Sequence, residues 1–133
     1  MKIELVSSGL MNPTTLTIII LCFHLVASIR VHATTHMVGD GSGWGHFTNS
    51  SNWAQGKEFH IGDILVFSYE SSVHNVVQVN SAAYESCTTN PNMGFFNSGN
   101  DRLVLADVGQ RWFICGVEDH CENGQKLSIS VVP

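Results

Sequence analysis

The stretch Gln110–Val132 reads QRWFICGVEDHCENGQKLSISVV and is the most informative part of the sequence. It opens on a run of apolar β-formers that ends at Cys115, and it closes on alternating apolar and polar residues from Leu127 onward. Alternation with a period of two is typical of a strand that buries one face, and the segment between the two runs, which contains Gly, Asn and Asp, is typical of a loop. We therefore expect two strands joined by a loop that carries His120 and Cys121.

Other short segments of the same kind precede this stretch. With it, they predict strands at residues 35–39, 63–69, 75–79, 102–107, 110–116 and 126–132. The segment 63–69 is mostly apolar, as expected for a strand buried on both faces, and residues 51–57 predict one short helix with Trp53 turned inward. Strands at this spacing, without a long helical period, indicate an all-β protein with an antiparallel sandwich or barrel.

The N-terminal part of the chain has the features of a secretory signal. Leu16–Ile29 is a mostly apolar run of 14 residues, shorter than the stretch of about 20 residues that a membrane-spanning helix needs. Lys2 precedes the run, Met11 is an alternative start, and small or compact residues end at Ala33, where we expect cleavage. The residues up to Ala33 are interpreted as a signal peptide and residues 34–133 as one secreted domain; the alternative is a buried apolar helix.

The predicted mature domain is acidic. The whole chain has eleven Asp and Glu against six Lys and Arg, and removal of Glu4, Lys2 and Arg30 leaves ten against four, a net charge of −6 with neutral histidine. Such a surface disfavours nucleic acid and anionic membranes as partners. The C-terminus lacks an apolar tail, so we expect no lipid anchor and interpret the domain as a monomer.

A sequon for N-glycosylation begins at Asn49, in the sequence Asn49-Ser50-Ser51. In a secreted chain it predicts a glycan on Asn49, and the alternative is an unmodified asparagine in a polar loop.

Three cysteines lie in the predicted domain, because Cys22, like His24, falls in the signal segment. In an oxidising compartment two cysteines are expected to pair, which leaves one over. The odd thiol could form an intermolecular bridge, act as a reactive group or bind a metal. A Cys87–Cys121 pair would contribute roughly 4 kcal/mol by closing a long loop, and it would leave Cys115 at the end of an apolar strand, where a buried thiol is more often inert packing.

Cys115, His120 and Gln125 follow one another at intervals of five residues, in the pattern C-x4-H-x4-Q. A thiolate at a strand end and an imidazole in the next loop can face one point, and His74, at the entry to the strand at 75–79, is the candidate third ligand. One Cys, two His and a weak axial donor form the blue-copper arrangement, whose thiolate and imidazoles suit both oxidation states of copper. The pattern predicts a copper site in which axial Gln125 favours Cu(II) relative to a methionine.

The remaining donors have simpler interpretations. A glutamine near a turn is normally solvated, so the alternative for Gln125 is a solvent-exposed turn residue. A lone histidine at a strand start is usually a surface residue. His74 is a candidate ligand only because the other three donors are present. Three other histidines lack such a context and are interpreted as surface residues: His36, His46 and His60. Two methionines could be proposed as axial donors but lie outside the ligand loop: Met37 and Met93.

The sequence from residue 34 onward resembles the phytocyanins, the plant blue copper proteins, and within them the stellacyanin-like group. The resemblance rests on segments that occur in family order and at family-like spacing: MVGDGSGW, WAQGKEFHIGDILVFSY, HNVVQV, YESC, SGNDRLVL and WFICGVEDHCENGQKL. They cover nearly all of residues 34–132. The resemblance implies a cupredoxin-like Greek-key β-sandwich with one or two short helices and one type 1 copper ion.

The resemblance also assigns roles to individual residues. It implies copper ligands at His74, Cys115, His120 and axial Gln125, a Cys87–Cys121 disulfide, and a bracing role for Asn75 beside the cysteine strand. Two positions depart from the family: Glu118-Asp119 stand where Pro-Gly or similar residues usually precede the histidine, and Trp112 replaces a smaller aromatic residue. The two acids remove no ligand, and they should stabilise Cu(II) further and disfavour anionic partners.

These observations favour a secreted, non-enzymatic one-electron carrier that cycles between Cu(II) and Cu(I) in the apoplast or cell wall, with a small-molecule or protein redox partner. The alternative is an extracellular wall or signalling module in which the domain has a structural or interaction role. An enzyme is disfavoured, because multicopper oxidases need H-x-H pairs that this sequence lacks, and Gln125 would fill the position that a hydrolytic zinc site leaves to water.

Overall fold

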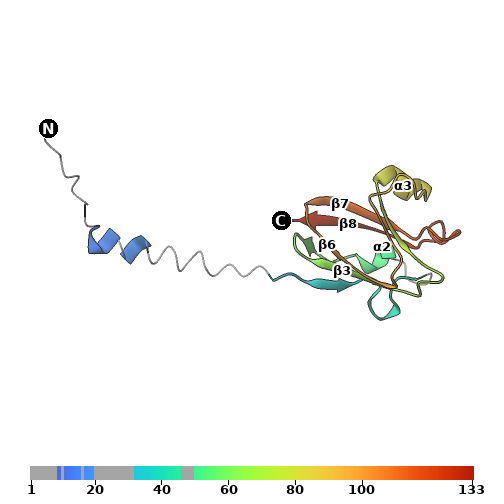
Figure 1. Cartoon of the computed structure of the whole chain (residues 1–133), viewed down its shortest axis with the longest axis horizontal. Coiled ribbons are helices and arrows are strands. Elements are labelled where there is room, and N and C mark those ends of the chain that lie inside the picture. The colour runs from blue at the N-terminus through green and yellow to red at the C-terminus, as the bar shows by residue number, and fades with distance from the viewer. Residues whose placement is uncertain (1–8, 10, 16, 20–31, 46–49) are drawn as a thin grey trace, which may run out of the picture. The chain divides into compact units, whose positions relative to one another are not determined.

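The computed structural model describes residues 9, 11–15, 17–19, 32–45 and 50–133. Ala33–Pro133 forms a compact unit of the chain (Figure 1). In the part of the chain before it, residues 13–15 and 17–19 are helical. No helix among the described residues is long and apolar enough to cross a membrane. Several sequence predictions fall outside the described residues: most of the signal segment, Cys22, His24, His46 and the sequon asparagine Asn49.

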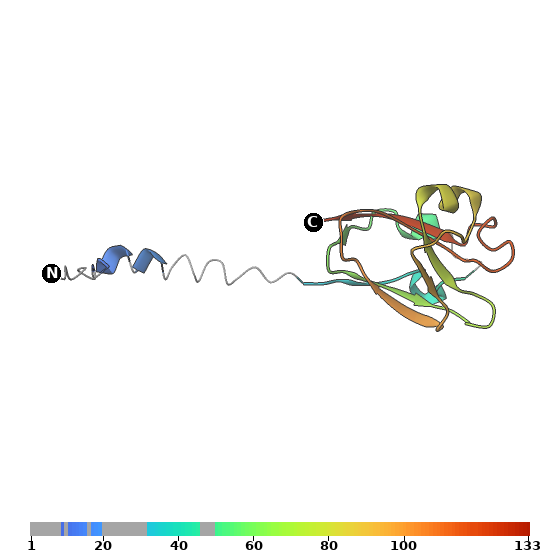
Figure 2. The same ribbon diagram turned by 45° about the horizontal axis from the view of Figure 1, so that its top comes forward.

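Within the described residues, eight strands form two sheets (Figures 1 and 2). The smaller sheet has the order β1-β3-β6 and comprises β1 (Thr35–Met37), β3 (Ile64–Ser68) and β6 (Asn100–Val104). The larger sheet has the order β2-β8-β7-β4-β5 and comprises β2 (Phe59–His60), β4 (Val76–Val79), β5 (Gly94–Phe96), β7 (Gly109–Ile114) and β8 (Lys126–Val132). Three short helical segments complete the described part of the domain: η1 (Asp40–Ser42), α2 (Ser50–Trp53) and α3 (Ser81–Ser86). The predicted all-β sandwich with short helices is confirmed.

The expectation of an antiparallel sandwich or barrel was wrong at two strand pairs. The pairs β3–β6, β4–β5, β4–β7 and β7–β8 are antiparallel, whereas β1 pairs with β3 and β2 pairs with β8 in parallel. Parallel neighbours need a long connection that returns the chain to the same end of the sheet. Residues 38–63 provide such a connection between β1 and β3, and because β2 and β8 lie far apart in the chain, sequence patterns did not reveal their pairing.

The sequence did not predict four elements, β2, β5, α3 and the 3-10 segment η1. The two strands are only two and three residues long, too short for an alternating pattern to stand out. α3 begins at a capping residue that the sequence offers: the side chain of Asn80 accepts a hydrogen bond of 2.9 Å from the backbone N–H of Ala83. The residue that caps its C-terminal end, Cys87, lies in the left-handed region with φ 53° and carries the chain away from the helix.

The two sheets enclose the core. The alternation predicted for the last strand is confirmed, because Leu127, Ile129 and Val131 are all buried. Residues 65–67 of β3 are buried in succession, as expected for the most apolar strand. The ring of Phe67 lies at the centre, 5.2 Å from the ring of Trp44 and 5.3 Å from that of Phe113 between centroids. The predicted inward Trp53 packs against the same cluster while remaining partly exposed.

We expect Phe67→Ala to lower the free energy of unfolding by about 3–5 kcal/mol, because the side chain is fully buried and its removal leaves a cavity between the sheets. Urea unfolding of the disulfide-bonded, metal-free domain measures the effect. Val104→Ala is the matched control, since this β6 side chain is 63% exposed and its truncation should change the free energy by no more than about 0.5 kcal/mol. Equal decreases in the free energy of unfolding for the two variants would contradict the position of Phe67 in the core.

Candidate metal centre

The pairing of β4 with β7 brings two of the predicted ligands together. Val77 of β4 lies opposite Ile114 of β7 in an antiparallel ladder. The residues just before β4 and just after β7 therefore lie at the same end of the sheet. His74 precedes β4 by two residues and Cys115 directly follows β7, so these side chains, 41 positions apart, become neighbours.

Three of the predicted donors converge on one point. The Nδ1 atoms of His74 and His120 are 3.2 Å apart, and the sulfur of Cys115 lies 4.0 Å from the first and 3.5 Å from the second. Imidazole nitrogen and thiolate sulfur bind metals at about 2.0–2.3 Å, so two ligands of one ion are separated by no more than about 4 Å. All three separations meet this limit, and Cys115 and His120 are buried while His74 is half-buried.

The loop between β7 and β8 positions the other donors through its own backbone. The amide of His120 donates to the carbonyl of Val117 at 3.1 Å, which turns the chain back toward the sheet. The amide of Gln125 then donates to the carbonyl of His120 at 2.9 Å, and the amide of Cys115 donates to the carbonyl of Gln125 at 3.0 Å. Gly124, with φ 100°, permits the reversal just before Gln125. Backbone hydrogen bonds thus link the three predicted loop ligands directly.

Gln125 is the residue that most clearly indicates a bound metal. It is only 1% exposed, and within the described part of the chain neither its amide oxygen nor its amide nitrogen has a hydrogen-bond partner. An unsatisfied buried amide costs free energy, so such a residue normally has a partner. The alternative of a solvated turn residue is contradicted by this burial. A soft thiolate, two imidazoles and a weak amide donor are a set of ligands that suits copper.

The thiol of Cys115 is the free cysteine of the domain, and it is buried. Burial raises the pKa of this thiol, and the backbone N–H groups of Asn75 and Val117, which point at the sulfur, oppose part of that rise. A thiol in this setting is inert without a metal, because the thiolate is the reactive form. Binding of a cation that favours the thiolate would displace the proton.

A disulfide joins Cys87 to Cys121, with Cα atoms 5.7 Å apart. It ties the C-terminal end of α3 to the loop residue next to His120. Cys121 is buried in a second apolar cluster with Val77 and Ile114, away from the cluster that contains Cys115. The pairing implied by the resemblance is therefore present, and the bridge anchors the loop without placing its sulfur among the donors.

Asn75 joins the two halves of the site. Its side-chain oxygen accepts a 2.6 Å hydrogen bond from the backbone N–H of Gly116, immediately after Cys115. Its backbone carbonyl accepts a 2.9 Å hydrogen bond from the indole N–H of Trp44. The asparagine therefore holds the end of β7 against the entry to β4, in agreement with the bracing role that the resemblance implied.

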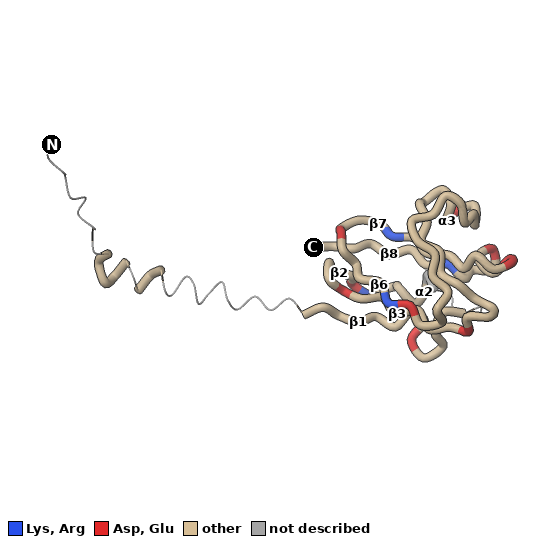
Figure 3. The backbone as a smooth tube through the Cα atoms, in the orientation of Figure 1, with Lys and Arg blue, Asp and Glu red and all other residues tan. Residues whose placement is uncertain are grey.

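Two acidic side chains directly precede His120 in the loop between β7 and β8. Glu118 and Asp119 are exposed, and with His120 they form a second group of potential ligand atoms within 4.8 Å of one another. Figure 3 shows acidic segments at the tip of the loop between β7 and β8. Exposed carboxylates remain hydrated, whereas the Cys115 group is largely buried, so the Cys115 group is the stronger candidate for a metal site.

One of the other histidines was interpreted wrongly. His36 is not a surface residue, because its side chain is 11% exposed and its Nε2 atom lies 2.8 Å from a carboxylate oxygen of Asp63. The reason is its position on β1, where its ring packs on Phe59 with centroids 4.7 Å apart. His60 is half-buried on β2. Met93 is 60% exposed, which is unlike a buried axial donor.

Comparison with known proteins identifies a group of close relatives. Residues 44–125 match the plastocyanin-like domain family. The chain is 43% identical over 103 residues to stellacyanin of Toxicodendron vernicifluum, a match that covers 74% of this chain and 96% of that protein. It is 41% identical over 112 residues to chemocyanin of Lilium longiflorum, a match that covers 84% of this chain and 86% of that protein.

Two solved structures have the same fold. Cucumber basic protein, a blue copper protein, superposes with a TM-score of 0.69 at 37% identity, covering 74% of this chain and all of that chain. Cucumber stellacyanin, in a structure with Cu²⁺ at pH 7.0, superposes with a TM-score of 0.66 at 35% identity, covering 76% of this chain and 97% of that one. The cupredoxin-like β-sandwich predicted from the sequence is confirmed.

We expect Asn75→Ala to lower the free energy of unfolding of the metal-free domain by about 1 kcal/mol, because the N–H of Gly116 loses its acceptor. Asn92→Ala is the matched control, since the Asn92 side chain donates to the carbonyl of Thr89 on the exposed surface. Its loss should change the free energy by less than about 0.5 kcal/mol. If urea unfolding finds both variants as stable as the parent, Asn75 does not brace the two strands.

Proposed function

Because the chain belongs to the plastocyanin-like domain family and, within it, to the phytocyanins, we propose that it is a secreted type 1 copper protein that carries single electrons. The observation that supports this most strongly is the convergence of His74, Cys115 and His120. The buried, unpartnered side chain of Gln125, whose backbone bonds to both Cys115 and His120, adds to it. An electron carrier needs a metal whose two oxidation states suit one set of donors, and this donor set meets that need.

We assign His74, Cys115 and His120 as the copper ligands and the side-chain oxygen of Gln125 as the axial donor. When bound, copper supplies the exchange of one electron between Cu(II) and Cu(I). The protein contributes the buried position of Cys115 and Gln125, which excludes water from the donors. It also contributes the disulfide beside His120 and the backbone bonds of the loop, which hold the donors in one arrangement.

A hydrolytic function is not supported by the arrangement of donors. Catalytic zinc sites keep one coordination position for water, whereas in the proposed site the buried side chain of Gln125 would fill that position. A purely structural wall or signalling module has no need of a buried, unpartnered glutamine beside a buried thiol. We therefore assign electron transfer and no enzymatic activity.

Location and processing complete the proposal. We infer that residues 1–33 are removed as a signal peptide and that residues 34–133 act outside the plant cell as a monomer, in the apoplast or cell wall. The redox partner is a small molecule or a protein that tolerates the acidic rim of Glu118 and Asp119, so a cationic or neutral partner is favoured over an anionic one.

We expect the copper-loaded domain to absorb intensely in the visible region, with the blue colour typical of thiolate-to-copper charge transfer. Cys115→Ser should abolish this colour, because a hydroxyl group does not replace the soft thiolate. Circular dichroism of the metal-free variant should show an intact β-sheet domain, which separates loss of the ligand from loss of the fold. A folded Cys115→Ser variant that stays blue would eliminate Cys115 as a ligand.

Gln125→Met tests the axial donor. A thioether is softer than an amide oxygen and favours Cu(I), so the reduction potential should rise. A rise of about 59 mV corresponds to a tenfold change in a one-electron equilibrium and is readily measured by voltammetry. In the metal-free domain the same substitution should leave stability unchanged or increase it, because it removes an unsatisfied buried amide.

The reduction potential and the stability of the Gln125→Met variant test different parts of the assignment. An unchanged reduction potential would show that a group other than Gln125 is the axial donor. A loss of stability in the metal-free variant would show that the glutamine serves packing or hydrogen bonding within the protein.

A further inference from the structure

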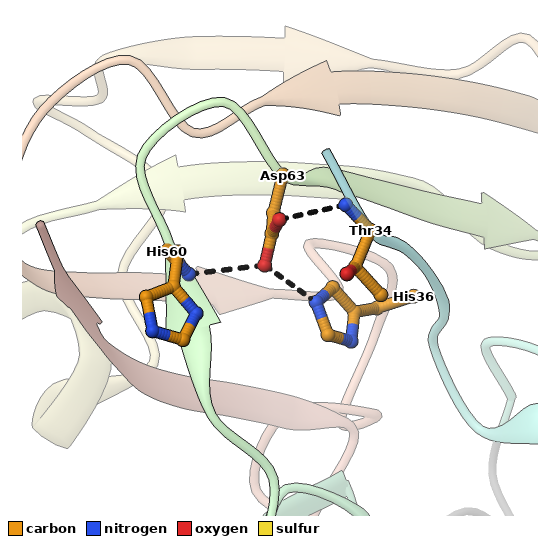
Figure 4. Close-up of polar contacts among 4 residues, drawn as sticks. All are labelled: Thr34, His36, His60 and Asp63. Carbon is orange, nitrogen blue, oxygen red and sulfur yellow. Dashed lines mark hydrogen bonds and ion pairs between the residues drawn. The ribbon is translucent and has the colours of Figure 1, made fainter. Parts of the chain in front are cut away.

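A second buried polar cluster lies far from the candidate metal centre. Its centre is Asp63, which is 2% exposed and directly precedes β3 (Figure 4). The cluster adjoins the end of β8, since Val132 pairs with His60, whereas the metal centre adjoins the beginning of β8 at Lys126. Seven residues of strand separate the two, a distance of roughly 20 Å.

Three nitrogen atoms surround the carboxylate of Asp63. One oxygen accepts a hydrogen bond of 2.8 Å from the backbone N–H of Thr34. The other accepts one of 3.0 Å from the backbone N–H of His60 and lies 2.8 Å from Nε2 of His36 (Figure 4). Burial alone raises the pKa of Asp63, but the hydrogen bonds from His36, His60 and Thr34 together lower it below its usual value. The cluster therefore holds a buried carboxylate in its charged form.

Thr34 is also the residue that follows the proposed cleavage site. Hydrolysis of the Ala33–Thr34 bond by an endopeptidase adds one water molecule, leaves a carboxylate on Ala33 and converts the amide nitrogen of Thr34 into a primary amine that takes up a proton. We propose that this new α-ammonium group is the counter-ion of Asp63, so that removal of the signal segment completes an ion pair in the domain. The inference rests on the proposed cleavage and is independent of copper.

The position of Thr34 does not depend on the peptide bond that cleavage removes. Its carbonyl accepts a 2.9 Å hydrogen bond from the amide of Ile64, and the following residues pair with β3 in parallel register from Thr35 to Met37. The nitrogen would therefore remain beside the carboxylate after cleavage. β1 has only three residues, and a short terminal strand frays unless it is tied down, so an ion pair at its first residue stabilises the edge of the sheet.

The groups that face this carboxylate determine how the ion pair depends on pH. His36 of β1 contacts it directly, and His60 of β2 contributes its backbone N–H with its ring alongside (Figure 4). From the β6 side, the amide of Leu105 donates to the backbone carbonyl of Asp63 and brings no charge. Pairing raises the pKa of an ammonium group above its unfolded value of about 7.7–8.0. The added stability is thus complete below that value and is lost as the pH rises through the folded pKa.

Two chains that differ only at the N-terminus test the proposal. One begins at Thr34, and the other retains Ala33 behind two added glycines, which restores a neutral amide at Thr34. At about pH 6 we expect the folded-to-unfolded ratio of the first chain, from urea unfolding, to exceed that of the second by roughly fivefold, because charged hydrogen bonds are stronger than neutral ones. At about pH 10 the two chains should converge. His36 and His60 are present in both chains, so their effects cancel in the comparison.

Asp63→Asn in both chains provides the matched control, since the amide keeps the shape of the side chain and removes its charge. The difference between the two N-termini should then disappear, and a difference that persists would overturn the proposal. If the variant does not fold, competitive acetylation of the parent beginning at Thr34 gives the pKa of the α-amine directly. A value above about 8 supports the ion pair, and an ordinary value of about 7.7–8.0 contradicts it.

The secreted full-length chain supplies the last test, because mass spectrometry identifies its first residue. A chain that begins at Thr34 supports the proposal, and one that begins at any other residue overturns it. Both engineered chains should bind copper with the same colour, so failure of the ion pair and failure of the copper assignment would be told apart.

Discussion

The antiparallel ladder between β4 and β7 is the interaction on which the candidate centre depends. It sets Val77 against Ile114, so that His74, two residues before β4, and Cys115, directly after β7, lie at the same end of the sheet. Neither strand could shift by one position without turning its buried side chains outward, because side chains alternate between the faces of a sheet. The apolar core therefore sets the separation of the His74 and Cys115 donors, and Asn75 holds the ends of the two strands together with one hydrogen bond.

The loop that supplies the remaining donors is compact because it is tied at several points. Backbone bonds connect Gln125 with His120 and with Cys115, and the disulfide attaches the neighbouring Cys121 to α3. Adjacent residues face opposite sides, since His120 points into the donor group while Cys121 is buried in the second apolar cluster. The disulfide of Cys121 can thus anchor the loop in the second apolar cluster while His120 reaches the donor group on the other side. This explains why a histidine and a cysteine occur next to each other.

Much of the fold and of the donor set could be predicted from the sequence, since strands such as β8 alternate cleanly and the spacing of Cys115, His120 and Gln125 is distinctive. Short elements such as β2 could not, because two residues carry no periodic signal. The burial of His36 and its contact with Asp63 depend on the parallel pairing of β1 with β3, a long-range relation that no local pattern expresses. The unpartnered state of Gln125 likewise required the surrounding structure, because the sequence alone allowed a solvated turn residue.

The separation of the three sulfurs has a consequence for the order of events during maturation. In the newly made domain, before the bridge forms, three thiols are available, and a soft metal ion that arrives early meets more than one possible thiolate. Once Cys87 and Cys121 are joined, Cys115 is the single remaining thiol, and it is buried. Oxidation of the first two therefore removes two thiols that could compete with Cys115 for a soft metal ion. A compartment that forms disulfides thus leaves the domain with a single thiol for a metal, in addition to the stability that the bridge provides.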